Sequence, residues 1–188
     1  MPISTDIANQ AILLIGGNMP PVTGVPPNFD GSTAGRAAGA LYGPCVATIA
    51  RQNCWDFARK TATLVATGNN PPPNWAFEYA YPTNAVQIWC LHPTLIADAN
   101  NPLPLNWTTA TAVVGGIPVR VIHAQNANLQ AVFNSNPPEA AWDSLFREAV
   151  VRLLASEMAM AIAGKPDVAR SLLESANAFS NIGNERDD

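Results

Sequence analysis

Charged side chains are scarce in this sequence. They make up 13% of its 188 residues, against about 25% in ordinary soluble domains. Between Thr61 and Pro138 only Glu78, Asp98 and Arg120 carry a charge. Such a stretch is poorly suited to a freely solvated surface, whereas the cores of protein interfaces are depleted of charge. We therefore expect it to pack against other copies or partners; the alternative is an ordinary neutral surface of Asn, Thr and Gln.

Three further scarcities exclude classes of protein. Only ten Lys and Arg residues occur, and they are scattered through a chain of net charge −4, which argues against nucleic-acid binding. No apolar run reaches the length of about 18 residues that a membrane span needs, and no charged segment precedes an apolar one as in a signal peptide. The three cysteines form no metal-binding spacing, which favours reduced thiols in a cytoplasmic setting.

Residues with catalytic or metal-binding chemistry are few. Cys90 and His92 form a C-x-H pair, and His123 is the only other histidine. A zinc site would also need Cys45 and Cys54 to converge on them, and a Cys–His nucleophile would need an orienting third group. No phosphate-binding or nucleophile-elbow motif is present. We predict no enzyme and no catalytic, cofactor or metal residue; a small Cys/His-dependent enzyme is the lesser alternative.

The strongest pattern in the chain predicts a helix from Asn136 to Ala163. Its large apolar residues recur in steps of three and four, which places them on one helix face. We expect Asn136 to cap this helix, with Pro137 in the first turn and Glu139 completing a capping box, and Gly164 to end it. The predicted core residues are Trp142, Leu145, Phe146, Val150 and Leu153.

Weaker patterns predict three more helices. Ser4 or Thr5 caps the first, and Asp30 or Ser32 opens the second. Pro44, after Gly43, should kink or break the second helix because it lacks a backbone N–H. The last begins at Pro166, and residues 181–188 have no apolar periodicity and should form a flexible tail.

The middle of the chain has the features of β structure. Alternating aromatic residues predict a strand from Asn74 to Tyr81. We expect these rings to form one buried face of the strand; the alternative is a surface on which a sugar or a base stacks. Further strands are expected at 85–91, 107–114, 117–123 and 129–133, and Gly115-Gly116 predicts a two-residue hairpin. The sequence thus predicts one α+β domain over 1–188. Its helical bundle comes from 1–53 and 137–180, and an antiparallel β insertion spans 54–136.

Three short segments, in the same order, resemble phage tail tubular protein A. The first is Trp55-Asp56-Phe57-Ala58-Arg59-Lys60, and the second is the aromatic strand from Trp75 to Pro82. The third is Trp142-Asp143-Ser144-Leu145-Phe146-Arg147-Glu148-Ala149. The resemblance extends from about Ala34 to Asn181, and departs from the family pattern at Asn84 and in the proline-rich loop 18–27.

The resemblance implies a structural virion protein, the head-to-tail adaptor of a tailed phage. Such adaptors form a ring of twelve subunits between the portal and the tail tube or nozzle protein, and DNA passes through the ring without specific binding. They have no catalytic residues, no cofactor and no membrane contact, and they assemble in the host cytoplasm. The alternative is another tail-completion or stopper component of the virion. The resemblance also points to portal docking by the C-terminal end, whose charged residues are Arg170, Glu174, Glu185, Arg186, Asp187 and Asp188.

Overall fold

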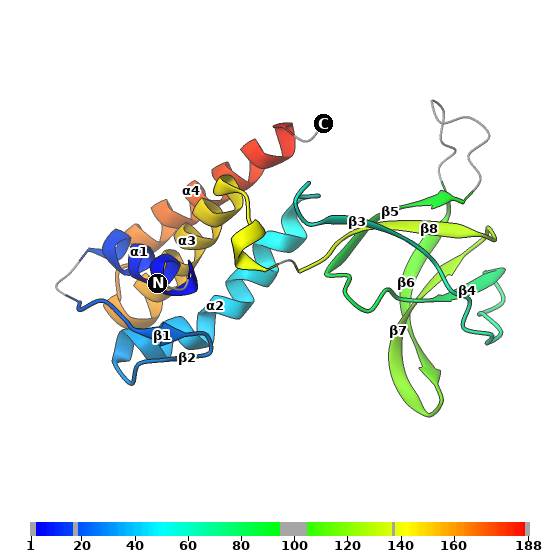
Figure 1. Ribbon diagram of the computed structural model, residues 1–188, viewed down its shortest axis with the longest axis horizontal. Coiled ribbons are helices and arrows are strands. Elements are labelled where there is room, and N and C mark those ends of the chain that lie inside the picture. Colours follow the sequence, from blue (N-terminus) through cyan, green and yellow to red (C-terminus); the bar gives the residue numbers. More distant parts are fainter. Residues whose placement is uncertain (1–2, 17–18, 95–104, 137, 187–188) are drawn as a thin grey trace. The chain divides into compact units, whose positions relative to one another are not determined.

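The chain folds into two compact units (Figure 1). The computed structural model describes residues 3–16, 19–94, 105–136 and 138–186. The helical unit comprises Met1–Ala58 and Pro137–Asp188, and the β unit comprises Arg59–Asn136. The fold class is α+β, with helices from both ends of the chain and antiparallel strands between them, as the sequence predicted. The first division follows Ala58 rather than Asn53, because Trp55 and Phe57 pack against a helix of the helical unit.

The helical unit is organised around α3. This helix contacts each of the other three long helices. Its residues Phe146, Val150 and Leu153 are buried, whereas Leu145, expected in the core, is only half-buried. The elements of this unit are α1 (Ile3–Ile15), β1 (Gly24–Val25), β2 (Asn28–Phe29), α2 (Thr33–Gln52), η1 (Glu139–Ala141), α3 (Ser144–Met158), η2 (Ala159–Ala163) and α4 (Pro166–Arg186).

The start of α3 differs from the prediction. Its N-cap is Asp143, whose carboxylate accepts a hydrogen bond from Leu145 N at 2.7 Å. Trp142 therefore precedes the helix, and the short 3-10 turn η1 comes before it. The expected cap at Asn136 and the capping box with Glu139 were wrong, and Pro137 lies outside the described residues. Glu139 instead accepts hydrogen bonds from Ser4 N and Tyr42 Oη, at 3.0 and 2.8 Å.

The first two helices bear on three more predictions. Ser4 and Thr5 lie buried inside α1 and do not cap it, and the Thr5 hydroxyl donates to Gly24 O. Ser32 does cap α2, because its Oγ accepts from Gly35 N at 2.9 Å. The helix then continues without a break through Pro44. Pro44 lies on the exposed side of α2, where water can solvate the carbonyl that the missing N–H leaves free.

The C-terminal helix is longer than predicted. After α3 the chain forms the π-helical segment η2, which ends at Gly164 with a left-handed φ of 57°, as the glycine signal indicated. α4 then runs to Arg186, so the flexible tail predicted from residue 181 was wrong as far as the described residues extend. Asn53 holds this helix near its end by donating from Nδ2 to Ser180 O and to Ser180 Oγ, the latter at 2.8 Å.

The β unit contains two three-stranded antiparallel sheets. One has the order β3-β8-β5 and the other β4-β7-β6. The first and last residues of the unit's strands are neighbours, since Arg59 on β3 pairs with Asn134 on β8. Their strands are β3 (Arg59–Thr63), β4 (Phe77–Ala80), β5 (Gln87–Pro93), β6 (Trp107–Val114), β7 (Ile117–Ala124) and β8 (Leu129–Asn134).

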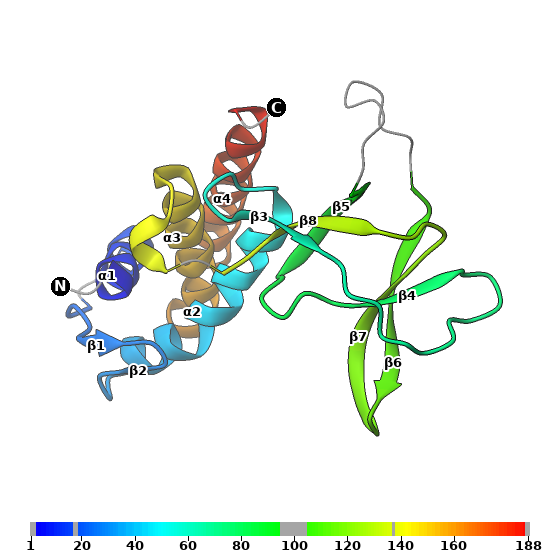
Figure 2. The ribbon, with the colours of Figure 1, turned by 45° about the vertical axis from the view of Figure 1, so that its right-hand side comes forward.

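The β6–β7 hairpin agrees closely with the sequence pattern. Gly115 and Gly116 form its two-residue turn with φ of 59° and 83°, a conformation that favours glycine. β4, shorter than predicted, pairs with no residue of β7 outside Val121–Ala124. The hairpin consequently extends well beyond the end of β4, as Figure 2 shows. The core of the unit lies between the sheets and comprises Leu64, Tyr79, Ile88, Leu91, Ile122, Ala124, Leu129, Ala131 and Phe133.

Candidate functional site

An aromatic cluster in the helical unit brings together two of the three segments quoted above. The ring of Phe146 contacts Trp55, Phe57 and Trp142, with centroid separations of 5.1, 5.1 and 4.9 Å and interplanar angles of 87°, 70° and 74°. These edge-on arrangements are the ones that aromatic quadrupoles favour. Trp55 is buried and donates from Nε1 to Ile49 O at 3.0 Å. Two segments far apart in the sequence therefore meet on one phenylalanine.

The second segment, the aromatic strand from Trp75 to Pro82, supplies β4 in the core of the β unit. Tyr79 is buried, and its hydroxyl donates to Asn126 O at 2.9 Å. Phe77 stacks beside it with ring centroids 6.2 Å apart. The strand alternates, so Glu78 points to the opposite face of the sheet from these rings.

Glu78 lies at the centre of a buried polar network. Its Oε2 is 3.1 Å from His123 Nε2, and Oε1 accepts from Thr67 Oγ1 at 2.7 Å and from Asn69 Nδ2 at 2.9 Å. Burial alone would raise the pKa of Glu78, but the hydrogen bonds from Thr67, Asn69 and His123 outweigh it and lower the pKa. Both carboxylate oxygens are occupied, so the network fixes the loop after β3 onto β4 and β7.

Sequence reasoning missed this network. His123 was considered only together with cysteines and His92, and Glu78 was not linked to it. A signal was nevertheless present, because Glu78 interrupts an aromatic strand with apolar neighbours on both sides. A charge in such a strand needs a buried partner whenever both sheet faces are covered.

The cysteines and histidines do not form the site considered above. Cys90 Sγ and His92 Nε2 lie 3.2 Å apart on β5, but His123 lies on the other sheet and pairs with Glu78. Burial raises the pKa of the Cys90 thiol despite the nearby Arg59, and burial raises that of Cys45 in the helical unit to about 12. Neutral thiols are weak nucleophiles and poor metal ligands. Within the described ranges, no three His, Cys, Asp or Glu side chains are grouped to hold a metal ion.

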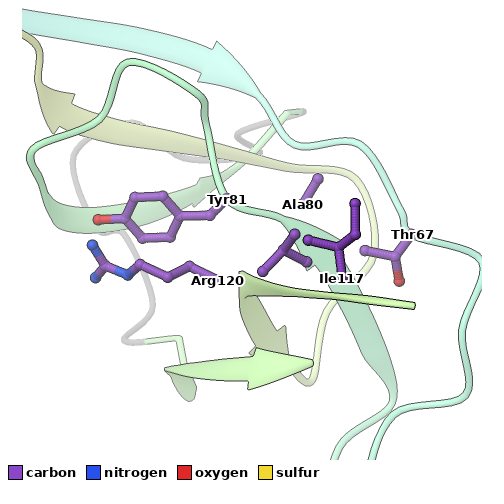
Figure 3. Close-up of a pocket in the computed structure, with 6 residues that line it drawn as sticks. Thr67, Ala80, Tyr81, Ile117 and Arg120 are labelled. Atoms are coloured by element: carbon purple, nitrogen blue, oxygen red, sulfur yellow. The ribbon is translucent and has the colours of Figure 1, made fainter. Parts of the chain in front are cut away.

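A hollow of about 340 Å³ lies where β4 leaves β7 (Figure 3). The Arg120 guanidinium carbon is 4.0 Å from the centroid of the Tyr81 ring, so the cation covers the ring face. Tyr81 Oη is buried and has no hydrogen-bond partner among the residues that the structure describes. The hollow is lined by Thr67, Ala80, Tyr81, Ile117, Val119 and Arg120. The hollow thus combines an apolar wall with the Arg120 guanidinium at one end.

The residues expected to dock on the portal do not form one described cluster. Arg170 and Glu174 are exposed and lie one turn apart on α4. Glu185 and Arg186 belong to the last turn of α4, and the positions of their side chains are not described. Asp187 and Asp188 lie outside the described residues. The structure therefore supports an exposed charged face for Arg170 and Glu174 alone.

Comparisons with known proteins identify no relative: a scan against models of protein families found no match, and a search of curated proteins found none. Among the helices that the structure describes, none combines the length and apolar character needed to cross a bilayer. The function is therefore inferred from the contacts above and from the three resembling segments.

Proposed function

We propose that this protein is a structural virion component, the head-to-tail adaptor of a tailed phage. Twelve copies would form a ring that joins the portal to the tail and encloses part of the DNA passage. The observation that carries this proposal is the cluster around Phe146. Two segments of the resemblance, Trp55–Ala58 and Trp142–Phe146, supply the rings that meet there.

The packing matters because each segment is short and weak evidence alone. Unrelated segments that match a pattern by chance need not touch in the folded chain. Here the first and third segments share one buried ring, and the second supplies the core strand β4. The residues of the resemblance thus hold each unit together, as expected of segments that specify a shared fold.

The distribution of charge also supports a ring subunit. The helical unit contains twelve acidic and seven basic residues, whereas the β unit contains two acidic and three basic ones. A charge-poor unit is suited to burial between neighbouring subunits. An acidic chain is also suited to a DNA passage, since basic walls would bind phosphates and slow the DNA.

Co-purification with the portal is the decisive experiment. The full chain would be produced with the portal and tail-tube proteins encoded in the same genome, and captured complexes imaged by electron microscopy. We expect a twelve-subunit ring on the portal. Capture by the tail tube alone would favour the tail-completion or stopper alternative, and capture by neither protein would overturn the proposal.

A truncation tests the docking end. Removing residues 181–188 leaves the Asn53 contacts to Ser180 in place, so we expect helicity and melting temperature close to those of the full chain. Portal binding should nevertheless weaken, because the removed residues carry four of the six charges expected to dock. Circular dichroism and a portal pull-down measure the two effects. Unchanged portal binding would place docking elsewhere on the chain.

A further inference from the structure

The hollow beside Tyr81 has the size and the composition of a small-molecule site. Its volume of about 340 Å³ lies at the lower end of the range of about 300–1,000 Å³ that is usual for such sites. Ala80, Ile117 and Val119 give it an apolar wall, and Arg120 gives it one charge. Sites for small molecules are mostly apolar in the same way, with a few polar groups that fix the orientation of the ligand.

The polar end of the hollow is suited to an anion. Arg120 is the only charged residue among the described residues that line the hollow, and it forms no ion pair with a described carboxylate. Thr67 also lines the hollow, but its hydroxyl already donates to Glu78 at 2.7 Å. The Tyr81 ring holds the guanidinium in place, 4.0 Å from the ring centroid (Figure 3). A stacked guanidinium presents parallel N–H donors that match the two oxygens of a carboxylate.

The other end of the hollow is an apolar surface in contact with water. Ile117 is 64% exposed and Val119 is half-buried. Figure 3 shows Ala80 and Ile117 beyond the stacked pair of Tyr81 and Arg120, away from the guanidinium. An apolar chain that lay along these side chains would remove apolar surface from water, which favours binding. The anion at one end and the chain at the other can belong to one molecule.

Three other classes of ligand suit the hollow less well. A base or a sugar needs a free aromatic face, but the Tyr81 ring packs against the core of the β unit and carries the guanidinium. An extended peptide adds to a sheet edge through main-chain hydrogen bonds, and Pro118 of β7 supplies no N–H for them. A cationic ligand would be repelled by the charge of Arg120.

We propose that the hollow binds a small organic carboxylate that carries an apolar chain. The carboxylate accepts two N–H donors from the Arg120 guanidinium, and the chain lies along Ala80, Ile117 and Val119. This site is separate from the adaptor function, because the aromatic cluster that supports that function belongs to the helical unit. Portal capture and ligand binding can therefore succeed or fail independently.

Titration of the isotope-labelled full chain with hexanoate tests the site by nuclear magnetic resonance. We expect saturable shifts of amide signals centred on residues 80, 81, 117, 119 and 120, in the millimolar range expected of so small a ligand. Hexanol and hexylamine have the same chain without the anion, and they should bind at least about tenfold more weakly. Shifts that do not saturate, shifts centred elsewhere, or equal binding of the three probes would overturn the proposal.

A matched pair of substitutions tests the role of the charge. Arg120→Met removes the cation, and Lys60→Met removes one from an exposed position on β3, outside the hollow. The ratio of hexanoate affinity to hexanol affinity, measured within each variant, isolates the charge from any change in the shape of the hollow. We expect Arg120→Met to lower this ratio at least about tenfold and Lys60→Met to leave it unchanged. An unchanged ratio in Arg120→Met, or an equal fall in both variants, would overturn the proposal.

A second pair tests the apolar wall. Ile117→Thr removes apolar contact, and it should weaken hexanoate and hexanol alike by about threefold or more. Val113→Thr is the control, because Val113 lies on the same hairpin and is 65% exposed but is not among the described residues that line the hollow. It should leave the affinity for both probes unchanged. Equal effects of the two substitutions on hexanoate binding would contradict the placement of the chain.

Discussion

The surfaces of the two units are solvated by different kinds of side chain. The helical unit has nineteen charged residues, whereas the β unit has five, of which Glu78 is buried. The helical unit can therefore be solvated over most of its surface, with an apolar and aromatic core around Phe146. The β unit instead presents Thr, Asn and exposed valines, and buries its carboxylate in a fully bonded network. The difference is that the helical unit relies on charged side chains for its solvation, whereas the β unit relies on neutral polar ones.

Removing the central ring of the helical core should have the largest effect. Phe146→Ala deletes a buried ring that contacts three others, and such truncations cost about 3–5 kcal/mol of folding free energy. Hydrogen exchange should show lost protection in α3 and retained protection in β7 and β8. Phe179→Ala, at a half-buried position, is the control and should cost less. Equal loss of protection in both units would show that they unfold together.

The buried carboxylate of the β unit should produce the next largest effect. Glu78→Gln keeps the shape of the side chain but replaces one carboxylate oxygen with an NH2 group, which cannot accept the hydrogen bonds that the oxygen accepts. We expect the free energy of unfolding to fall by about 1–3 kcal/mol. The folded-state pKa of Glu78 is below its ordinary 4.5, so its contribution to stability is complete above that pH and is lost as pH falls toward the folded value.

Urea unfolding at about pH 6 and about pH 4 measures this contribution. The wild-type chain should lose more stability over that interval than Glu78→Gln. Glu148→Gln is the control, because its partner Arg152 is 3.5 Å away at a partly exposed site and such pairs contribute about 0–1 kcal/mol. A parallel pH dependence in wild type and Glu78→Gln would refute the assigned role of the carboxylate.

Helix capping in the helical unit should contribute less. Ser32→Ala removes the hydroxyl that accepts from Gly35 N, and N-cap losses of this kind cost about 1 kcal/mol. Ser32→Gly, which leaves the N–H open to water, should cost only a few tenths of a kcal/mol. Thermal unfolding monitored by circular dichroism distinguishes the two. Identical melting temperatures for Ser32→Ala and wild type would contradict the capping geometry.

The smallest effect is expected from the cation above Tyr81. Arg120→Met keeps an unbranched apolar stem but removes the charge, and an exposed cation–π contact is worth about 0.5–1 kcal/mol. Arg152→Met is the equivalent change in the helical unit, where the guanidinium carbon lies 4.6 Å from the centroid of the Phe179 ring. It should cost somewhat more, because Arg152 also pairs with Glu148. A stability gain for Arg120→Met would refute the stacking.

Local signals predicted the hairpin, the Ser32 cap and the Gly164 stop, but failed at the start of α3. Gly115 and Gly116 determine where β6 ends and β7 begins, because a two-residue turn fixes the register of the two strands. At α3, by contrast, Asn136 and Asp143 are both able to cap a helix. The choice between them depends on Trp142 packing against Phe146 and on Glu139 binding Tyr42. Those contacts come from distant segments, which periodicity does not report.

The candidate surfaces were less predictable for the same reason. Glu78 and His123 are brought together only by the pairing of β4 with β7. The hollow beside Tyr81 exists because β4 ends before the hairpin does. The charge-poor composition of the region was visible in the sequence, but it does not say which side chains face outward. The residues that face outward could be assigned only from the strand register.

The pairing of Arg59 with Asn134 makes the β unit separable in a simple topological sense. Directly opposed residues of antiparallel strands have Cα atoms only about 5 Å apart. Everything between them could therefore be exchanged for a short turn, or for a longer insert, without moving the two attachment points. Closing a longer loop there costs little additional entropy, because the cost grows only with the logarithm of its length. The β unit could thus be gained, lost or replaced in evolution without changing the path of the helices around Phe146.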